Sequence, residues 1–242
     1  MRCLFEVACA KSCPPIGAAS KQEDRAVSLW LRWVLANSLA ETVGLGATFG
    51  IGVILFHYLH APGVLVALTT VAVAVLAGTL IEGTVVGTAQ WFVLRRPFPA
   101  MKWRAWVLAT ALGAFVAWTL GMLPSTLMSA GSEARGSEPS EAMVYSLAAL
   151  MGLAAGTILG TPQWFVLRRH VPRAALWIPA NALAWVPGML LAFVGANFIF
   201  SAGRGVSTVM LAIATLIAIG TVVGAIHGLA LVWLVRPRRA RG

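Results

Sequence analysis

The residues best suited to chemistry in this chain are three ionisable side chains inside long apolar segments. Glu41 and Glu82 lie near the middle of two such segments, and His227 lies in the last one. A carboxyl group at mid-bilayer costs roughly 2.5–3.5 kcal/mol on insertion scales and marks a functional site by default. No Lys or Arg lies at their depth. We therefore expect both glutamates to be protonated, or to bind a proton or a cation. A neutral carboxyl hydrogen-bonded to the next helix is the alternative.

Polar side chains at a similar depth extend this candidate site. The helical rise of ~1.5 Å per residue places five of them in one zone of the cytoplasmic half: Asn37, Gln90, Gln163, Asn181 and His227. Such groups are costly in hydrocarbon unless they meet one another or water. Together with Glu41 and Glu82 they form our candidate ligand- or ion-binding site, arranged as a polar layer around a central axis.

The other reactive residues do not assemble into a catalytic site. The only aspartate, Asp24, precedes the first apolar segment, and no nucleophile–base pair can be built. No lysine lies inside an apolar segment, and no two histidines lie at matched depth, which disfavours a retinal Schiff base or a bis-histidine haem. Cys3, Cys9 and Cys13 match no common metal-binding spacing. We predict a protein that is not an enzyme and holds no metal and no cofactor.

Six apolar segments must position the candidate site. Of the 242 residues, 59% are hydrophobic and 11% are charged, whereas soluble domains carry about 25% charged residues. A spanning helix needs about 20 apolar residues, and the segments that satisfy this run approximately 29–56, 63–93, 104–123, 142–167, 175–200 and 206–235. We predict an all-α membrane protein with six transmembrane helices. Residues 27–237 form the membrane domain, 1–26 a disordered cytoplasmic tail, and 238–242 a basic tail.

An internal repeat organises these segments. Residues 83–96 read GTVVGTAQWFVLRR and residues 156–169 read GTILGTPQWFVLRR, identical at eleven of fourteen positions. GTVVG recurs at 220–224, which puts His227 at the register of Gln90 and Gln163. Two-span units of this length are internal duplications. We predict three parallel two-helix repeats, at about 27–96, 102–169 and 174–237, packed as a pseudo-threefold bundle.

Small and aromatic residues indicate how the helices pack. Glycines four apart, such as Gly83 and Gly87, let helix backbones approach closely in lipid, and Gln90 continues the same helix face. Most tryptophans fall near the predicted cytoplasmic boundary: Trp30, Trp33, Trp91, Trp103, Trp106, Trp164, Trp177 and Trp233. We interpret these as an interfacial belt.

The repeated G-T-x-x-G-x-x-Q-W-x-V-L-R-R hairpins resemble a group of uncharacterised bacterial multi-pass membrane proteins, over roughly residues 27–237. The resemblance implies a protein of the bacterial inner membrane and no particular activity. The third repeat departs from the motif, because His227-Gly228 replaces Gln-Trp. The function of the motif therefore need not involve all three repeats.

The charge distribution predicts orientation and partners. Of 18 Lys and Arg residues, only Arg135 and Arg204 fall on one side of the predicted membrane, and 16 fall on the other. The positive-inside rule then places both termini in the cytoplasm. Charge placed in this way indicates contact with anionic lipid head groups at the cytoplasmic face rather than nucleic acid.

Two function classes remain. The first is a membrane binding or scaffold protein whose buried polar layer serves an unidentified lipid, a protein partner or a second copy of the chain. The alternative is a small proton- or cation-coupled permease or channel that uses Glu41 and Glu82.

Overall fold

The computed structural model describes residues 16–58, 64–131, 140–203 and 205–236. The predicted tail segments 1–15 and 238–242 lie outside these described residues. Within the described ranges every regular element is helical and no strand occurs. The elements are α2 (Ile16–Tyr58), α3 (Val64–Ala77), the π-helical segment η1 (Gly78–Glu82), α4 (Gly83–Leu94), α5 (Trp103–Gly131), α6 (Glu141–Leu167), the 3-10 turn η2 (Ala174–Leu176), α7 (Trp177–Ser201) and α8 (Val206–Val235).

Six of these helical stretches are long and apolar enough to cross a membrane, which confirms the predicted all-α fold class. They run Lys21–Leu55, Leu65–Leu94, Trp103–Met122, Glu141–Leu167, Ala174–Ser201 and Val206–Val235. The second span joins α3, η1 and α4 into one continuous helix. The first helix begins at Ile16, earlier than the predicted start of the membrane domain at 27, so residues 16–26 are helical.

The helices pack in a closed ring. α4 contacts α5, α6 contacts α7, and α8 returns to α2, so each even span of one repeat packs against the odd span of the next. Contacts inside each repeat, α2 with α4, α5 with α6 and α7 with α8, complete the ring. A cyclic arrangement of the repeats requires this order of contacts; the threefold symmetry itself stays a prediction.

Glycines form the contacts between repeats, as the spacing predicted. A carbon added at these glycines would approach the backbone of the facing helix: 2.8 Å from Ala111 Cα at Gly83, 2.7 Å from Ala182 Cα at Gly156 and 2.7 Å from Ser38 Cα at Gly220. Contacts this short leave no room for a side chain. Close backbone approach is how helices gain packing energy in lipid, where burial of apolar area no longer drives association.

Large apolar side chains point outward and polar ones point inward. Leu39, Leu108 and Leu183 are 68%, 68% and 62% exposed, while Asn37 and Asn181 are 1% and 3% exposed. This distribution is the reverse of that in a soluble bundle, and it suits a molecule whose surrounding solvent is lipid.

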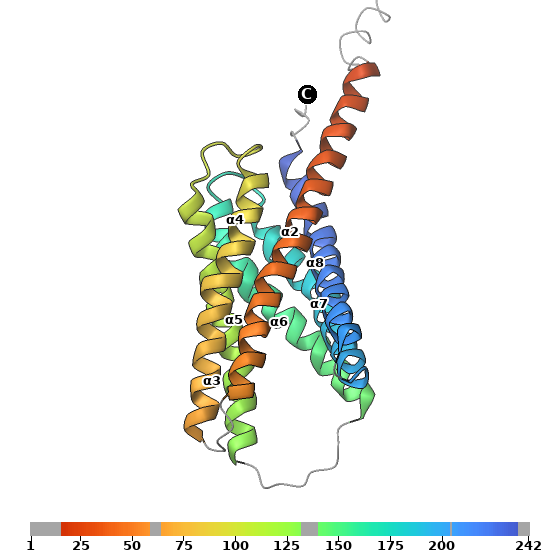
Figure 1. Cartoon of the computed structure of the whole chain (residues 1–242). Coiled ribbons are helices and arrows are strands. Elements are labelled where there is room, and N and C mark those ends of the chain that lie inside the picture. The colour runs from red at the N-terminus through yellow and green to blue at the C-terminus, as the bar shows by residue number, and fades with distance from the viewer. Residues whose placement is uncertain (1–15, 59–63, 132–139, 204, 237–242) are drawn as a thin grey trace, which may run out of the picture.

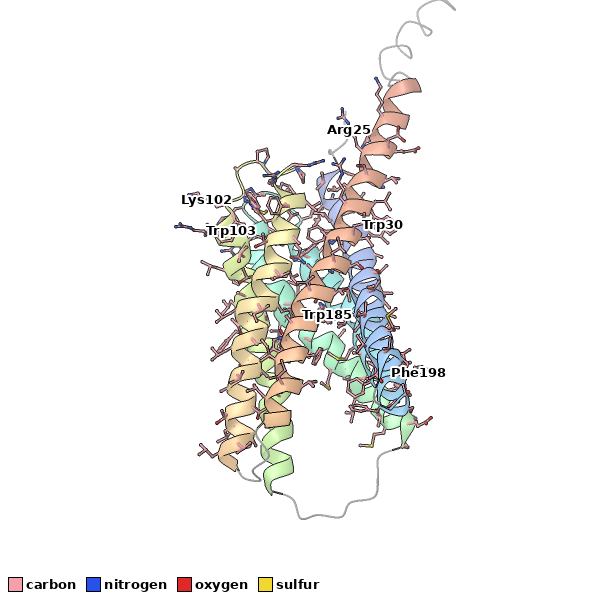
Figure 2. All side chains as sticks on the ribbon, viewed as in Figure 1. Arg25, Trp30, Lys102, Trp103, Trp185 and Phe198 are labelled. Atoms are coloured by element: carbon pink, nitrogen blue, oxygen red, sulfur yellow. The ribbon has the colours of Figure 1, made fainter. Side chains whose placement is uncertain are left out.

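The two ends of the bundle differ. The start of α2 and the end of α8 lie at one end, and at the other end α3 and α5 diverge from α6, α7 and α8 (Figure 1). Arg25 and Lys102 lie at the first end, together with Trp30 and Trp103, whereas Phe198 lies toward the second (Figure 2). We call the first the basic end and the second the splayed end.

Candidate functional site

Three tryptophans close the bundle interior near the basic end. Trp33, Trp106 and Trp177 are all 0% exposed. The ring centroids of Trp33 and Trp177 lie 5.7 Å apart, and those of Trp106 and Trp177 lie 6.2 Å apart. The interfacial-belt interpretation is therefore wrong for these three, because they lie in the cytoplasmic half of the odd spans as predicted but are fully buried in the bundle. An indole that faces the membrane interface and one that faces the bundle interior have the same hydropathy and the same position near a span end. The sequence therefore could not distinguish the two.

Each of these indoles donates a hydrogen bond to the even span of the preceding repeat in the ring. Trp106 Nε1 donates to Gln90 Oε1 at 3.1 Å, and Trp177 Nε1 donates to Gln163 Oε1 at 2.9 Å. Trp33 Nε1 donates to His227 Nδ1 at 2.7 Å. The histidine thus takes the acceptor role that glutamine holds in the other two repeats.

The glutamines also connect the repeats to one another. Gln90 Nε2 donates to Asn37 Oδ1 at 2.8 Å, and Gln163 Nε2 donates to Thr110 Oγ1 at 3.0 Å and to Gln90 Oε1 at 3.1 Å. Asn37, Thr110 and Asn181 in turn bond the backbone oxygen of the tryptophan four residues earlier. The result is one hydrogen-bonded polar layer that spans the three repeats.

The third repeat leaves this layer incomplete. Gln90 and Gln163 reach the Asn or Thr of their own repeat, but among the described residues no hydrogen bond joins His227 to Asn181. A cavity of about 20 Å³ lies here, lined by His227, Asn181, both glutamines, Thr110 and both glutamates. That volume is enough for a single water molecule. We call it the polar cavity.

Glu41 reaches the polar cavity from α2. Its side chain is 3% exposed, and its Oε2 atom has no hydrogen-bond partner among the described residues. It lies on α2 four residues after Asn37 and seven before Thr48, a spacing that puts the three on one helix face, and both neighbours are buried. A buried carboxyl oxygen without a partner is uncommon in native structures and indicates a water, an ion or a proton-transfer role.

Glu82 reaches the same cavity from the π-helical segment. The Gly83 amide bonds Gly78 O, five residues back, and Glu82 is the last residue of this wider turn. Glu82 Oε2 accepts a 2.7 Å hydrogen bond from Trp118 Nε1. Gly78 makes room for the indole, since an added carbon there would overlap the Trp118 ring. π-Helical turns inside α-helices frequently occur at functional sites.

A larger cavity begins at Glu82 and extends toward the splayed end. It has a volume of about 260 Å³, and we call it the apolar chamber. Phe49 and Met151, two of its lining residues, are 54% and 40% exposed, so the chamber opens at the molecular surface. Its lining is Leu45, Phe49, Glu82, Ala114, Ala117, Trp118, Gly121, Met122, Met151, Ala155, Leu159, Trp185, Gly188, Met189, Ala192 and Ile219.

The structure brings all seven sequence-predicted site residues together. Six line the polar cavity, and Asn37 joins them through its hydrogen bond to Gln90. Their role as ligand- or ion-binding groups stays a prediction. The sequence missed two members. Thr110 could have been found, because it holds the register of Asn37 and Asn181, but no sequence signal singled out Trp118 as a partner of Glu82.

Metal binding by clustered side chains finds no support in the described part of the chain, where no group of three or more His, Cys, Asp or Glu residues could hold an ion. Nor does a basic side chain form an ion pair with Glu41 or Glu82 there. What the arrangement can do chemically is bind: it offers two carboxyls, several amides and an apolar chamber that leads to one of the carboxyls.

The chain matches no known family model, no curated protein and no solved structure. The function must therefore be argued from the site itself.

Proposed function

We propose that this integral membrane protein is a binding protein that holds a small, largely apolar ligand in the apolar chamber. One observation carries the proposal: the chamber is open at the molecular surface and ends at the buried Glu82 carboxyl. Ligand pockets are typically apolar cavities of roughly 300–1,000 Å³ with a few placed polar groups. At about 260 Å³, this chamber lies just below that range, which suits a small ligand.

The polar layer supports binding because it closes the inner end of the chamber and so forms its floor. The three buried tryptophans and the glutamine network fill the bundle between the chamber and the basic end, so a ligand in the chamber has no open path in that direction. A hydrogen-bonded layer in which each member holds the next keeps the floor rigid, and a rigid site loses less free energy on binding.

The proposal is tested by filling the chamber. Ala155 lines it, while its neighbour Ala154 is exposed on the outer face of α6. Protein extracted from native membranes is examined by native mass spectrometry for bound small molecules. Wild type and Ala154→Phe should carry the same ligand, and Ala155→Phe should lose it while keeping its melting temperature. An identical ligand on Ala155→Phe would exclude the chamber as the binding site.

A second candidate function is a proton- or cation-coupled permease. The observation that favours it is the pair of buried glutamates on one cavity, one with an unpartnered oxygen. In reconstituted vesicles, wild type should then carry a proton or cation flux that Glu82→Gln or Glu41→Gln abolishes. Flux that survives both substitutions would remove the glutamates from the mechanism, and absence of flux in wild type would leave binding as the function.

Anionic lipid at the basic end is part of the proposal. A cavity of about 480 Å³ between the start of α2 and the end of α8 carries Lys21, Arg25 and Arg236 beside apolar side chains. Each basic residue near an anionic surface contributes about 1 kcal/mol. With the charge bias, this supports a protein of the cell inner membrane with both termini in the cytoplasm.

A further inference from the structure

We propose that the ligand of the apolar chamber is a lipophilic cation: a small apolar body that carries one ammonium group, which pairs with Glu82. The inference rests on the proposed function and names the chemical class of the ligand. Three features of the chamber carry it: the unpaired carboxyl, the aromatic and methionine walls, and the device that positions the carboxyl.

The first feature is a carboxyl group without a cation. Glu82 is 7% exposed and lines both the apolar chamber and the polar cavity. Trp118 bonds its Oε2 atom, and among the described residues no hydrogen bond occupies Oε1. Among the residues that the structure describes, no Lys or Arg lines the chamber. A carboxylate held in a low-dielectric site lacks most of its hydration, so a ligand that brings a positive charge is favoured there over a neutral or anionic one.

The second feature is the wall. Trp118 and Trp185 line the chamber, and Phe49 packs edge-on against Trp118 with ring centroids 5.9 Å apart. The face of an indole attracts ammonium groups, most strongly where water is excluded. Met151 and Met189 add flexible, polarisable surface that adapts to an irregular apolar body. These walls offer a sugar or a peptide few hydrogen-bond partners, because among the described lining residues only Glu82 and the two indoles have side chains with N–H, O–H or oxygen groups.

The third feature is the positioning of the carboxyl. The wide turn of η1 places Glu82 at the junction of the two cavities, and Gly78 leaves the space that the Trp118 indole fills. On the other side, Glu82 packs against α2 at Gly44, where an added carbon would lie 2.9 Å from Glu82 Cα. Contacts from α2 and α5 and the backbone of its own helix therefore fix the position of the Glu82 carboxyl. A fixed carboxyl is suited to binding a ligand at one point rather than to moving with it.

The volume of the chamber limits the size of the lipophilic cation. About 260 Å³ exceeds the roughly 150 Å³ that holds benzene in an engineered apolar cavity. A single aromatic ring or short alkyl chain with a trimethylammonium-sized head therefore fits, whereas a two-chain lipid can enter only in part.

The test uses two probes of one shape. Phenyltrimethylammonium carries the positive charge, and tert-butylbenzene replaces the nitrogen by carbon. Binding of labelled phenyltrimethylammonium to the purified full chain in non-ionic detergent is measured by equilibrium dialysis, and tert-butylbenzene is the competitor. The variants are Glu82→Gln, which keeps the shape and an oxygen acceptor for Trp118, and Glu141→Gln, which removes an exposed carboxylate at the start of α6.

We expect wild type and Glu141→Gln to bind the cation equally, Glu82→Gln to bind it at least tenfold more weakly, and the neutral isostere to compete at least tenfold more weakly than the unlabelled cation. Equal binding by Glu82→Gln, or equal competition by the isostere, would overturn the cation inference and leave the chamber as a site for neutral ligands. Ala155→Phe is a third variant, and cation binding that it leaves unchanged would place the probe outside the chamber and overturn the cation inference. The proposed function is decided separately, by whether Ala155→Phe loses the native ligand in mass spectrometry. Should Glu82→Gln fail to fold, the competition in wild type still decides.

Discussion

At the scale of single residues, the polar layer shows how one substitution changes a repeated design. Gln90 and Gln163 each accept an indole N–H through Oε1 and donate through Nε2. His227 accepts from Trp33 through Nδ1, so the neutral ring carries its proton on Nε2. Among the described residues no second bond joins the ring to Asn181, whereas each glutamine also donates within its own repeat. The polar cavity is the space that this substitution leaves beside Asn181.

This argument predicts opposite outcomes for two substitutions at His227. Glutamine should accept from Trp33 and donate to Asn181, as the other repeats do, so His227→Gln should keep or raise the thermal stability in detergent. His227→Leu should cost about 1–3 kcal/mol, because it leaves the buried Trp33 N–H without an acceptor. Thermal unfolding followed by tryptophan fluorescence measures both. Equal losses for Gln and Leu would mean that the hydrogen bond contributes nothing and that only ring packing matters.

At the scale of helices, the contacts between repeats decide stability. The tightest contact with a facing backbone lies between α6 and α7, where a methyl group at Gly156 would overlap the Asn181 carbonyl group. At Gly160, the same group would lie 3.1 Å from Asn181 Cβ. At Gly50 on α2, it would meet nothing within 4 Å. The three glycines share a residue type but not an environment.

The loss of stability on alanine substitution should therefore decrease in the same order, from Gly156 through Gly160 to Gly50. Gly156→Ala should destabilise the bundle by at least the ~1–3 kcal/mol typical of overpacking, because the carbonyl it meets belongs to a helix backbone. Gly160→Ala should cost less, and Gly50→Ala should be neutral or slightly stabilising through better helix propensity. Melting temperatures of the three variants give the ranking. A Gly50→Ala loss as large as that of Gly156→Ala would contradict the contact argument.

Some features of the helices could be predicted from the sequence, and others could not. Span positions and glycine faces were predictable, because length, hydropathy and a four-residue spacing encode them directly. The π-helical turn at Gly78–Glu82 was not, since one extra residue in a turn leaves hydropathy unchanged. The partnership of Glu82 with Trp118 depends on that turn, so it was out of reach as well.

At the scale of the whole molecule, the register of the repeated motif predicted that Gln90, Gln163 and His227 would lie in one zone, and all three line the polar cavity. Parallel units in a ring bring matching positions together, and Leu94, Leu167 and Leu231, which hold one register, are all fully buried in one cluster with the three tryptophans. The apolar chamber was not predictable in this way, because it depends on how far the helices diverge at the splayed end (Figure 1). Small lining residues such as Ala114 and Ala155 permit the space without encoding it.

Orientation in the membrane is the whole-molecule property that the charge bias predicts, and it decides which side of the membrane the splayed end faces. Ser201 is exposed at the splayed end of α7, and Ala100 is exposed in the loop at the basic end. Cysteine is introduced at either position in a background that lacks Cys3, Cys9 and Cys13, and intact cells are treated with a membrane-impermeant thiol reagent. Ser201→Cys should be labelled in intact cells, and Ala100→Cys should be labelled only after the membrane is broken. The positive-inside rule gives this outcome, because the sequence predicts 16 of the 18 basic residues on the side of Ala100. The reverse pattern would place both termini outside the cytoplasm and the splayed end toward the cell interior.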